Sequence, residues 1–330
     1  METGLTRFKT ITLPDQFTCS ERIFPLALAP TGTEESMEAA CGHIHAEKNE
    51  LLALSRDHGA LLIRGLPLQT AQDFDAHVQA FDLPNFPYKK SLSNAVRINR
   101  TERVFTANEA PPETFIPLHH EMAQTPLYPD RLFFFCELAA ESGGTTPVCH
   151  SGILWNKLES ERPDFAEACA THGLKYTHVM PPENDAASGL GRSWRSTFSV
   201  ETREDAETRM SGLGYSWEWL DKECLRTTTP VLPAMLEIPS ADGTIKTFFN
   251  QLIAAFYGWR DSRNDPSRAI TMGNGDFIDP ADIHAATELA ESCTFDISWQ
   301  NGDIALIDNR IAMHGRKPFR GTRKVLASLA

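Results

Sequence analysis

Two histidines and a glutamate lie close together in the segment PLHHEMAQT, residues 117–125. If this segment is extended, residues two positions apart point to the same side of the strand. His119 and Glu121 then share one side, and His120 points to the other. Imidazole and carboxylate groups both bind metal ions. The spacing therefore predicts His119 and Glu121 as a pair of metal ligands.

A third ligand has to come from a distant part of the chain, and His314 is the candidate. It lies in IALIDNRIAMHGRKPF, where an apolar run gives way to basic residues. Two imidazoles and one carboxylate on one face of an octahedral ion leave the other positions open, which is the arrangement of non-heme Fe(II) oxygenases. A short H-x-E motif also occurs by chance, and a single histidine is more often hydrogen-bonded than metal-bound. The motif alone leaves both interpretations open.

Short strands are the elements that must position these residues. Beyond Glu102 the chain has many short runs that are rich in β-branched and aromatic residues and bounded by Gly, Pro, Asn or Asp. Such a pattern favours a barrel or jelly roll over a doubly wound sheet. The predicted strands are RVFTANE (103–109), RLFFFCEL (131–138), TTPVCHS (145–151), IKTFFNQL (245–252), CTFDISW (293–299), DIALIDNRIAMHG (303–315) and KVLASLA (324–330).

Helical patterns precede and interrupt these strands. Residues 33–59 and 70–81 are predicted to be helical, with a short strand at 60–68 between them. Residues 152–226 are polar and partly helical, which indicates an insertion of the kind that often covers an active site. We therefore expect one mainly β (α+β) domain over residues 1–330. Its N-terminal α/β segment is expected at 1–103, and its core, which carries the insertion, at 104–330.

Composition argues against several classes of partner. The formal net charge of -13 opposes binding to a phosphate backbone, so nucleic acid is not expected as a partner. Membrane insertion is not expected either, because no apolar run approaches the length of a membrane span. The first residues resemble neither a secretory signal nor a transit peptide, so a cytoplasmic location is expected. The 7 cysteines are scattered and form no C-x-x-C pair, which disfavours a disulfide framework or a zinc ribbon.

Two blocks of the sequence resemble the TauD/TfdA-type Fe(II)- and 2-oxoglutarate-dependent oxygenases, and within them the clavaminate synthase-like and SyrP-like branch. The resemblance implies a double-stranded β-helix, a cupin-like distorted jelly roll whose mouth is covered by helical insertions. It also implies metal binding by His119, Glu121 and His314. The blocks are TANEAPPETFIPLHHEMAQTPLYPDRLFFFCELAAESGGTTPVCHS (106–151) and WQNGDIALIDNRIAMHGRKPFRGTRKVLASLA (299–330).

The resemblance also suggests how 2-oxoglutarate is held. Its far carboxylate needs a bidentate cation and a hydroxyl donor. The family's arginine and threonine fall on Arg323, in GTRKVL, and Thr146, in GGTT; Lys324 or Arg320 takes the cation's role if the register is shifted. Where taurine dioxygenase has a second arginine for the substrate sulfonate, this chain has Ser328 or an uncharged neighbour. A sulfonate substrate is therefore not expected.

The implied reaction is a hydroxylation. With Fe(II), 2-oxoglutarate and O2, an unactivated C–H bond of an amino acid or related small natural-product intermediate becomes an alcohol, with release of succinate and CO2. Related halogenases have no carboxylate in the slot of Glu121, so this residue favours oxygenation. The alternatives are desaturation, epoxidation or cyclisation by the same iron chemistry, a non-catalytic barrel that binds a small molecule, and a zinc hydrolase.

Contacts to the substrate are the least defined part of the site. Asn108, Arg195 and Asn250 are candidates for hydrogen bonds to it. Asn250 is predicted near the end of a barrel strand, although a purely structural role fits it equally well. The substrate is expected to be a small molecule, either free or tethered to a carrier protein, and the oligomeric state is left open.

Overall fold

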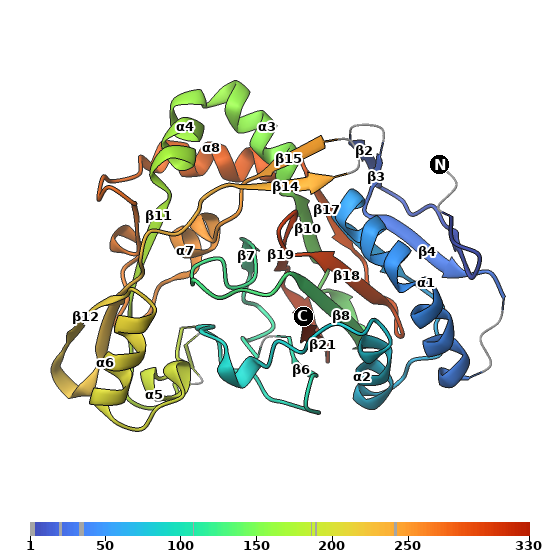
Figure 1. Cartoon of the computed structure of the whole chain (residues 1–330), viewed down its shortest axis with the longest axis horizontal. Coiled ribbons are helices and arrows are strands. Elements are labelled where there is room, and N and C mark those ends of the chain that lie inside the picture. The colour runs from blue at the N-terminus through green and yellow to red at the C-terminus, as the bar shows by residue number, and fades with distance from the viewer. Residues whose placement is uncertain are drawn as a thin grey trace.

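A seven-stranded sheet and a four-stranded sheet enclose the central core of the protein in a computed structural model (Figure 1). The structure describes residues 4–19, 22–32, 36–107, 109–185, 187–188, 190–240 and 243–330. The larger sheet has the order β1 (Phe8–Thr10), β4 (Leu26–Pro30), β5 (Ala60–Ile63), β18 (Ile304–Asp308), β8 (Arg131–Leu138), β21 (Lys324–Leu329), β6 (Phe105–Thr106). The smaller sheet has the order β17 (Thr294–Ile297), β10 (Thr146–His150), β19 (Ala312–Arg316), β7 (Ile116–His119).

The strand β8 is apolar on both sides because the seven-stranded sheet is covered on both faces. Successive side chains of a strand point to opposite faces. Leu132 and Phe134 accordingly belong to the core between the two sheets, whereas Phe133 and Phe135 belong to a second core. This second core lies under the helices α1 (Met37–His58) and α2 (Ala71–Gln79), which pack on one side of the sheet (Figure 1).

Both N-terminal helices begin at residues whose side chains cap them, and the first begins four residues later than predicted. The Ser36 hydroxyl accepts a hydrogen bond from the Ala39 amide at the start of α1. The Thr70 hydroxyl accepts one from the Asp73 amide at the start of α2, and the Asp73 carboxylate accepts one from the Thr70 amide in return. Gly59 ends α1 with a positive φ of 77°, a conformation that glycine adopts without strain.

The segment between β10 and β17 extends beyond the predicted insertion at 152–226. Its described strands join neither of the two sheets above. Its helices and the outer face of the four-stranded sheet, with Leu118, Cys149 and Met313, enclose a third core. The elements of this segment are α3 (Ser151–Glu161), α4 (Pro163–His172), β11 (Leu174–Met180), α5 (Trp194–Phe198), α6 (Arg203–Gly212), β12 (Ser216–Trp219), η2 (Asp221–Glu223), β13 (Leu225–Thr228), β14 (Leu236–Ser240), β15 (Gly243–Thr247), α7 (Leu252–Gly258), η3 (Pro266–Arg268), β16 (Ile270–Met272) and α8 (Pro280–Glu291).

Several predicted elements differ in the structure. The predicted barrel strand 245–252 ends at Thr247, pairs only with β14 and gives way to α7 at Leu252. The predicted strand 303–315 is divided into β18 and β19 by a turn that contains Asn309. Within the partly helical insertion predicted at 152–226, residues 203–226 are helical in α6 and in the short η2, and their other elements, from Ser216 on, are strands. A short apolar run does not by its composition distinguish a strand from a buried helix.

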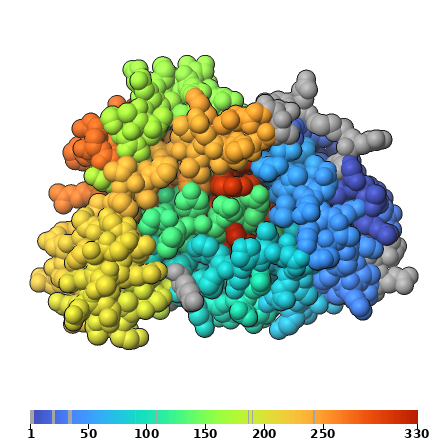
Figure 2. Space-filling model, viewed as in Figure 1, coloured from blue at the N-terminus to red at the C-terminus, as the bar shows by residue number. Residues whose placement is uncertain are grey.

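Few elements remain outside these layers. Figure 2 shows that C-terminal residues, in red, reach this face of the molecule only in small areas between segments from earlier in the chain. None of the described helices combines the length and the apolar character needed to cross a membrane. The remaining elements are the strand pairs β2 (Phe17–Cys19) with β3 (Arg22–Phe24) and β9 (Ser142–Gly143) with β20 (Phe319–Arg320), and η1 (Tyr88–Lys90).

Candidate active site

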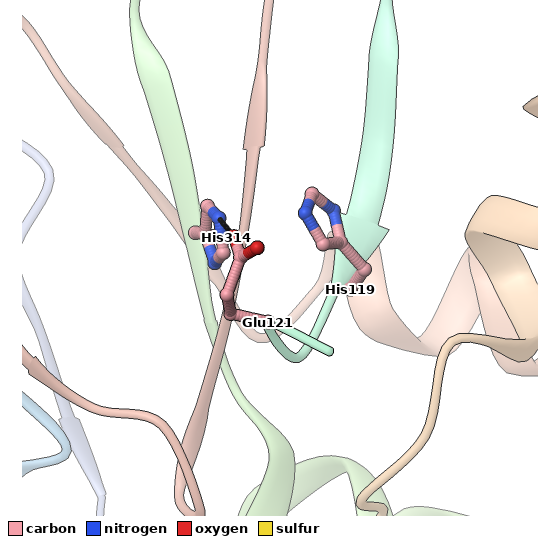
Figure 3. Close-up of side chains that lie close together, drawn as sticks. All are labelled: His119, Glu121 and His314. Carbon is pink, nitrogen blue, oxygen red and sulfur yellow. Dashed lines mark ion pairs between the residues drawn. The ribbon is translucent and has the colours of Figure 1, made fainter. Parts of the chain in front are cut away.

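The structure brings His119, Glu121 and His314 together. His119 ends β7 and lies directly opposite His314 on the neighbouring strand β19. The two rings and the Glu121 carboxylate point toward one another (Figure 3). One ligand atom from each residue lies within 4.8 Å of those of the other two, and His314 Nε2 is 3.5 Å from Glu121 Oε2. The strand pair therefore sets the two imidazoles side by side, and the turn after β7 adds the carboxylate.

Glu121 reaches this position from a turn and not from a strand, so the prediction of an extended IPLHHEM is wrong beyond His119. The chain leaves β7 after His119, and Met122 has a positive φ of 57°. His120 points away from the site, as predicted, and its Nε2 lies 3.1 Å from the carbonyl oxygen of Phe248. The other ring nitrogen of His120 contacts the carbonyl oxygen of Asn309.

The His119 imidazole and the Glu121 carboxylate have the protonation states that a metal requires. His119 Nδ1 lies 2.8 Å from the Pro117 carbonyl oxygen and donates to it, which leaves the Nε2 lone pair free. Burial, and next the neighbouring His314, lower the pKa of His119 to about 3, so its ring is neutral. His314 Nδ1 is buried without a hydrogen-bond partner. Burial opposes ionisation of Glu121, but Arg97 and the two histidines outweigh it and hold the pKa of this carboxyl below its usual range.

Arg97 is part of the site and was not found from the sequence. Its Nη2 lies 3.1 Å from both carboxylate oxygens of Glu121. The guanidinium carbon is 5.0 Å from the ring centre of Tyr88 and 5.4 Å from that of Phe105. Arg97 is one of several arginines between two strands in the sequence, and no spacing relates it to Glu121.

Thr146 and Arg323 also meet, as the resemblance implies. Arg323 donates from Nε to the Gly144 carbonyl oxygen at 3.0 Å and from Nη2 to Thr146 Oγ1 at 3.2 Å. Trp299 Nε1 donates to the same hydroxyl at 2.9 Å. Because Thr146 Oγ1 accepts from both neighbours, its own hydrogen is free to be donated to a further group.

The charge of Arg323 is not paired with any carboxylate among the described residues. Burial, followed by the nearby Arg316, lowers the pKa of Arg323 to about 10, and the guanidinium stays charged at neutral pH. A partly buried cation without a counter-ion fits a site that is completed by an anionic ligand. The position therefore suits the far carboxylate of 2-oxoglutarate.

Two cavities adjoin the three candidate ligands. The smaller, of about 40 Å³, is lined by Thr146, Arg323 and both histidines. The larger, of about 140 Å³, is lined by His119 and Glu121 and by residues of the segments 93–97, 110–117 and 251–259. Arg97, Ile116 and His119 line both cavities. A third cavity of about 350 Å³, between β3, α1, α3 and β15, shares no lining residue with these two.

Of the three predicted substrate residues, the two that the structure describes, Arg195 and Asn250, do not line the cavities beside the three candidate ligands. Asn108 lies outside the described residues. Arg195, on α5, forms ion pairs with Glu223 and Glu183 and does not line the cavities described above. Asn250 is buried in the loop before α7, where its side chain donates to the Ala234 carbonyl oxygen and accepts from the Leu252 amide. Its amide is thus used within the protein.

Comparison with known proteins agrees with this geometry. The sequence model of the family described as "Taurine catabolism dioxygenase TauD, TfdA family" matches residues 27–329. The chain is 37% identical over 323 residues to a clavaminate synthase-like protein of Arabidopsis thaliana, and the match covers 96% of each chain. The chain belongs to the TauD/TfdA dioxygenase family. It is a non-heme oxygenase that depends on Fe(II), 2-oxoglutarate and O2.

Two further known proteins are similar to the chain. The dapdiamide synthesis protein DdaC of Enterobacter agglomerans is 25% identical over 306 residues, which are 86% of this chain and 85% of that protein. An asparagine oxygenase solved with Fe(II), a hydroxyasparagine and succinate has 14% sequence identity and a TM-score of 0.52, and covers 91% of this chain and 86% of its own. At 14% identity the similarity to the asparagine oxygenase shows a common fold.

Proposed function

We propose that this TauD/TfdA oxygenase holds a single Fe(II) on His119, Glu121 and His314 and hydroxylates an unactivated C–H bond of a small substrate. The observation that carries the proposal is the convergence of these three side chains beside Arg323, an arginine that has no carboxylate partner in the described residues. When bound, Fe(II) and 2-oxoglutarate supply the oxidation, in which O2 converts the C–H bond to C–OH and 2-oxoglutarate to succinate and CO2.

The side chains have separate tasks in this scheme. His119 offers the Nε2 lone pair, because its other ring nitrogen is engaged with Pro117. His314 offers Nε2, the ring nitrogen that lies 3.5 Å from Glu121 Oε2. Glu121 supplies the negative charge that favours a divalent cation. Two imidazoles and one carboxylate leave coordination positions for the co-substrate and O2.

The residues around Arg323 hold the co-substrate. The guanidinium and the free hydrogen of the Thr146 hydroxyl donate to the far carboxylate of 2-oxoglutarate, and Trp299 keeps the threonine hydroxyl turned toward it. Such a fixed set of donors orients the co-substrate before the reaction and excludes water from its carboxylate.

The scaffold for these groups is a double-stranded β-helix in this proposal. Its two sheets are the seven-stranded and four-stranded sheets that enclose the central core, and the segment between β10 and β17 covers one side of the smaller sheet. The whole of residues 1–330 then works as one oxygenase domain. An amino acid or a related small natural-product intermediate is the proposed substrate, supported by the similarity to a dapdiamide synthesis protein.

An anaerobic titration tests the proposal. Purified apoprotein is mixed with Fe(II), with 2-oxoglutarate and with both, and the visible metal-to-ligand charge-transfer band is recorded for the wild type and for His314→Ala. We expect a band that requires both additions and is absent in the folded variant. A folded wild-type protein without a band would overturn the proposal.

A further inference from the structure

Arg97 and Gln124 are buried polar residues of the larger cavity, and each has a side-chain atom without a hydrogen-bond partner. Among the described residues that line this cavity, Arg97 and Glu121 are the charged ones, and the rest are neutral polar or apolar. The Arg97 side chain is only 7% exposed, and its Nε is buried without a hydrogen-bond partner. Gln124 is 5% exposed, and its Oε1 is likewise buried without a partner.

The charge of Arg97 loses its counter-ion when the site is loaded. In the metal-free protein it is paired with Glu121. Once Fe(II) takes up the Glu121 charge and Arg323 holds 2-oxoglutarate, the charges of iron and 2-oxoglutarate cancel, as do those of Glu121 and Arg323. The positive charge of Arg97 is then left unbalanced in a buried position. Burial of an unpaired charge is costly, so a further anion beside Arg97 is favoured.

Whereas Arg97 requires an anionic acceptor, Gln124 requires a hydrogen-bond donor. It lies in the turn that carries Glu121, residues 121–124, and its unpartnered Oε1 needs a hydrogen-bond donor. A ligand that satisfies both residues carries a carboxylate and an N–H group. The rings of Tyr88 and Phe105 on Arg97 hold the guanidinium in place for such a ligand.

We propose that the larger cavity binds a free amino acid, with its carboxylate on Arg97 and its amino group on Gln124. This inference rests on the proposed function, because it requires the loaded metal site. It also defines the substrate class more narrowly: an amino acid whose carboxyl group is tied up in an ester, amide or carrier thioester lacks the anion that Arg97 requires.

The test measures binding without turnover. The enzyme is loaded with 2-oxoglutarate and with Mn(II) in place of iron, and loading is measured from the loss of the free Mn(II) EPR signal. The probes are carbon-13-labelled glycine, β-alanine and γ-aminobutyrate, each compared with its carboxamide. Relaxation of the labelled carbon by Mn(II) reports binding next to the metal. At least one amino acid is expected to relax strongly, and its carboxamide to bind about 10- to 100-fold more weakly, the range for a lost hydrogen bond to a charged group.

Variants separate the two contacts. Arg97→Met should weaken binding of that amino acid to the level of its carboxamide, and Arg97→Lys should retain part of it. Gln124→Met leaves the Arg97–Glu121 pair in place. It should weaken binding of the amino acid but not binding of the corresponding carboxylic acid without an amino group. Arg226→Met, at an exposed arginine on β13, is the matched control and should bind like the wild type.

The outcomes are distinguishable. Failure of folded wild-type enzyme to load Mn(II) and 2-oxoglutarate would overturn the proposed function, and this inference with it. Normal loading without preference for any of the amino acids over their carboxamides would overturn this inference alone. So would unchanged binding in both Arg97→Met and Gln124→Met when both variants load normally.

Discussion

The Asn309 side chain holds both backbone polar groups of Glu121. Its amide oxygen accepts from the Glu121 amide at 2.8 Å, and its amide nitrogen donates to the Glu121 carbonyl oxygen at 3.0 Å. The same nitrogen donates to the Pro129 carbonyl oxygen at 2.8 Å. Asn309 lies in the turn between β18 and β19, so the turn that leads into the strand of His314 also fixes the backbone that carries the proposed carboxylate ligand.

Replacement of Asn309 by leucine should therefore damage both stability and metal binding. The change keeps the approximate size of the side chain but leaves the buried backbone groups of Glu121 unsatisfied, at a cost of about 1–3 kcal/mol for each group. We expect the free energy of unfolding, measured with urea, to fall by about 2–4 kcal/mol, and iron affinity, measured by chelator competition, to fall as well. The same change at Asn156, exposed on α3, is the control. A free energy of unfolding equal to that of the wild type in Asn309→Leu would contradict a stabilising role of the hydrogen bonds between Asn309 and Glu121.

The pair of Arg97 and Glu121 should show strong coupling in a double-mutant cycle. Glu121→Gln leaves a buried guanidinium without a carboxylate, and loss of one partner of a buried pair typically costs about 3–5 kcal/mol. Removal of the charge of Arg97 at the same time should restore part of the stability of metal-free protein. Urea unfolding of the wild type, Glu121→Gln, Arg97→Met and the double variant measures this coupling. Additive losses would show that the two side chains do not stabilise each other.

Arg323 should govern the affinity for 2-oxoglutarate and leave that for iron unchanged. Arg323→Met removes a charged donor pair, and we expect the dissociation constant of 2-oxoglutarate to rise by about 100-fold. Arg323→Lys keeps the charge but not the two parallel N–H donors. Its dissociation constant for 2-oxoglutarate should lie between those of the wild type and Arg323→Met. The charge-transfer band, titrated with 2-oxoglutarate at saturating Fe(II), gives the constant. A loss of iron binding in the absence of 2-oxoglutarate would instead indicate a structural role.

His77 should make the folded protein sensitive to acid. Both ring nitrogens of this α2 residue are buried without partners, and burial lowers the pKa of His77 to about 3 from its ordinary 6.5. Between these values the unfolded chain binds a proton that the folded protein does not. The contribution of the neutral His77 ring to the free energy of unfolding is therefore complete above pH 6.5. It is lost as the pH falls toward 3, by about 1.4 kcal/mol per pH unit.

Substitution of His77 by leucine removes this proton uptake. Urea unfolding between pH 7 and pH 4 should then show a shallower decline of the free energy of unfolding than in the wild type. His172, exposed at the end of α4, provides the control substitution. An unchanged slope in His77→Leu would show that the ring becomes protonated in the folded state.

The sequence alone placed the two histidines of the site on strands, but it did not place Glu121 on the correct element and did not indicate Arg97. His119 and His314 were each placed in a predicted strand by local apolar patterns, and the resemblance to the oxygenase family grouped them, but the pairing of β7 with β19 was not predicted. Glu121 meets the two histidines although it was placed on the wrong element, because a turn with a positive φ at Met122 has no sequence signature when the residue is not glycine or asparagine.

Arg97 and Trp299 could not be found because their partners are distant in the chain. Arg97 meets Glu121 across 24 positions and Trp299 meets Thr146 across 153, and no local pattern encodes such contacts. Asn250 was misread for another reason: FFNQ resembles the end of a strand, whereas in the structure the asparagine side chain bonds to the start of α7.

The strand order also determines when the site can form. β18 lies between β5 and β8, β21 lies between β8 and β6, and β19 lies between β10 and β7. Strands β1, β4 and β5 can therefore pair with one another early, whereas β7 and β8 have no neighbours in their sheets until these C-terminal strands have left the ribosome. Until then their edges stay open to wrong partners, and iron finds at most two of its three proposed ligands. The yield of folded enzyme therefore depends on whether synthesis of the C-terminal strands is completed before the exposed strand edges of the partial chain aggregate.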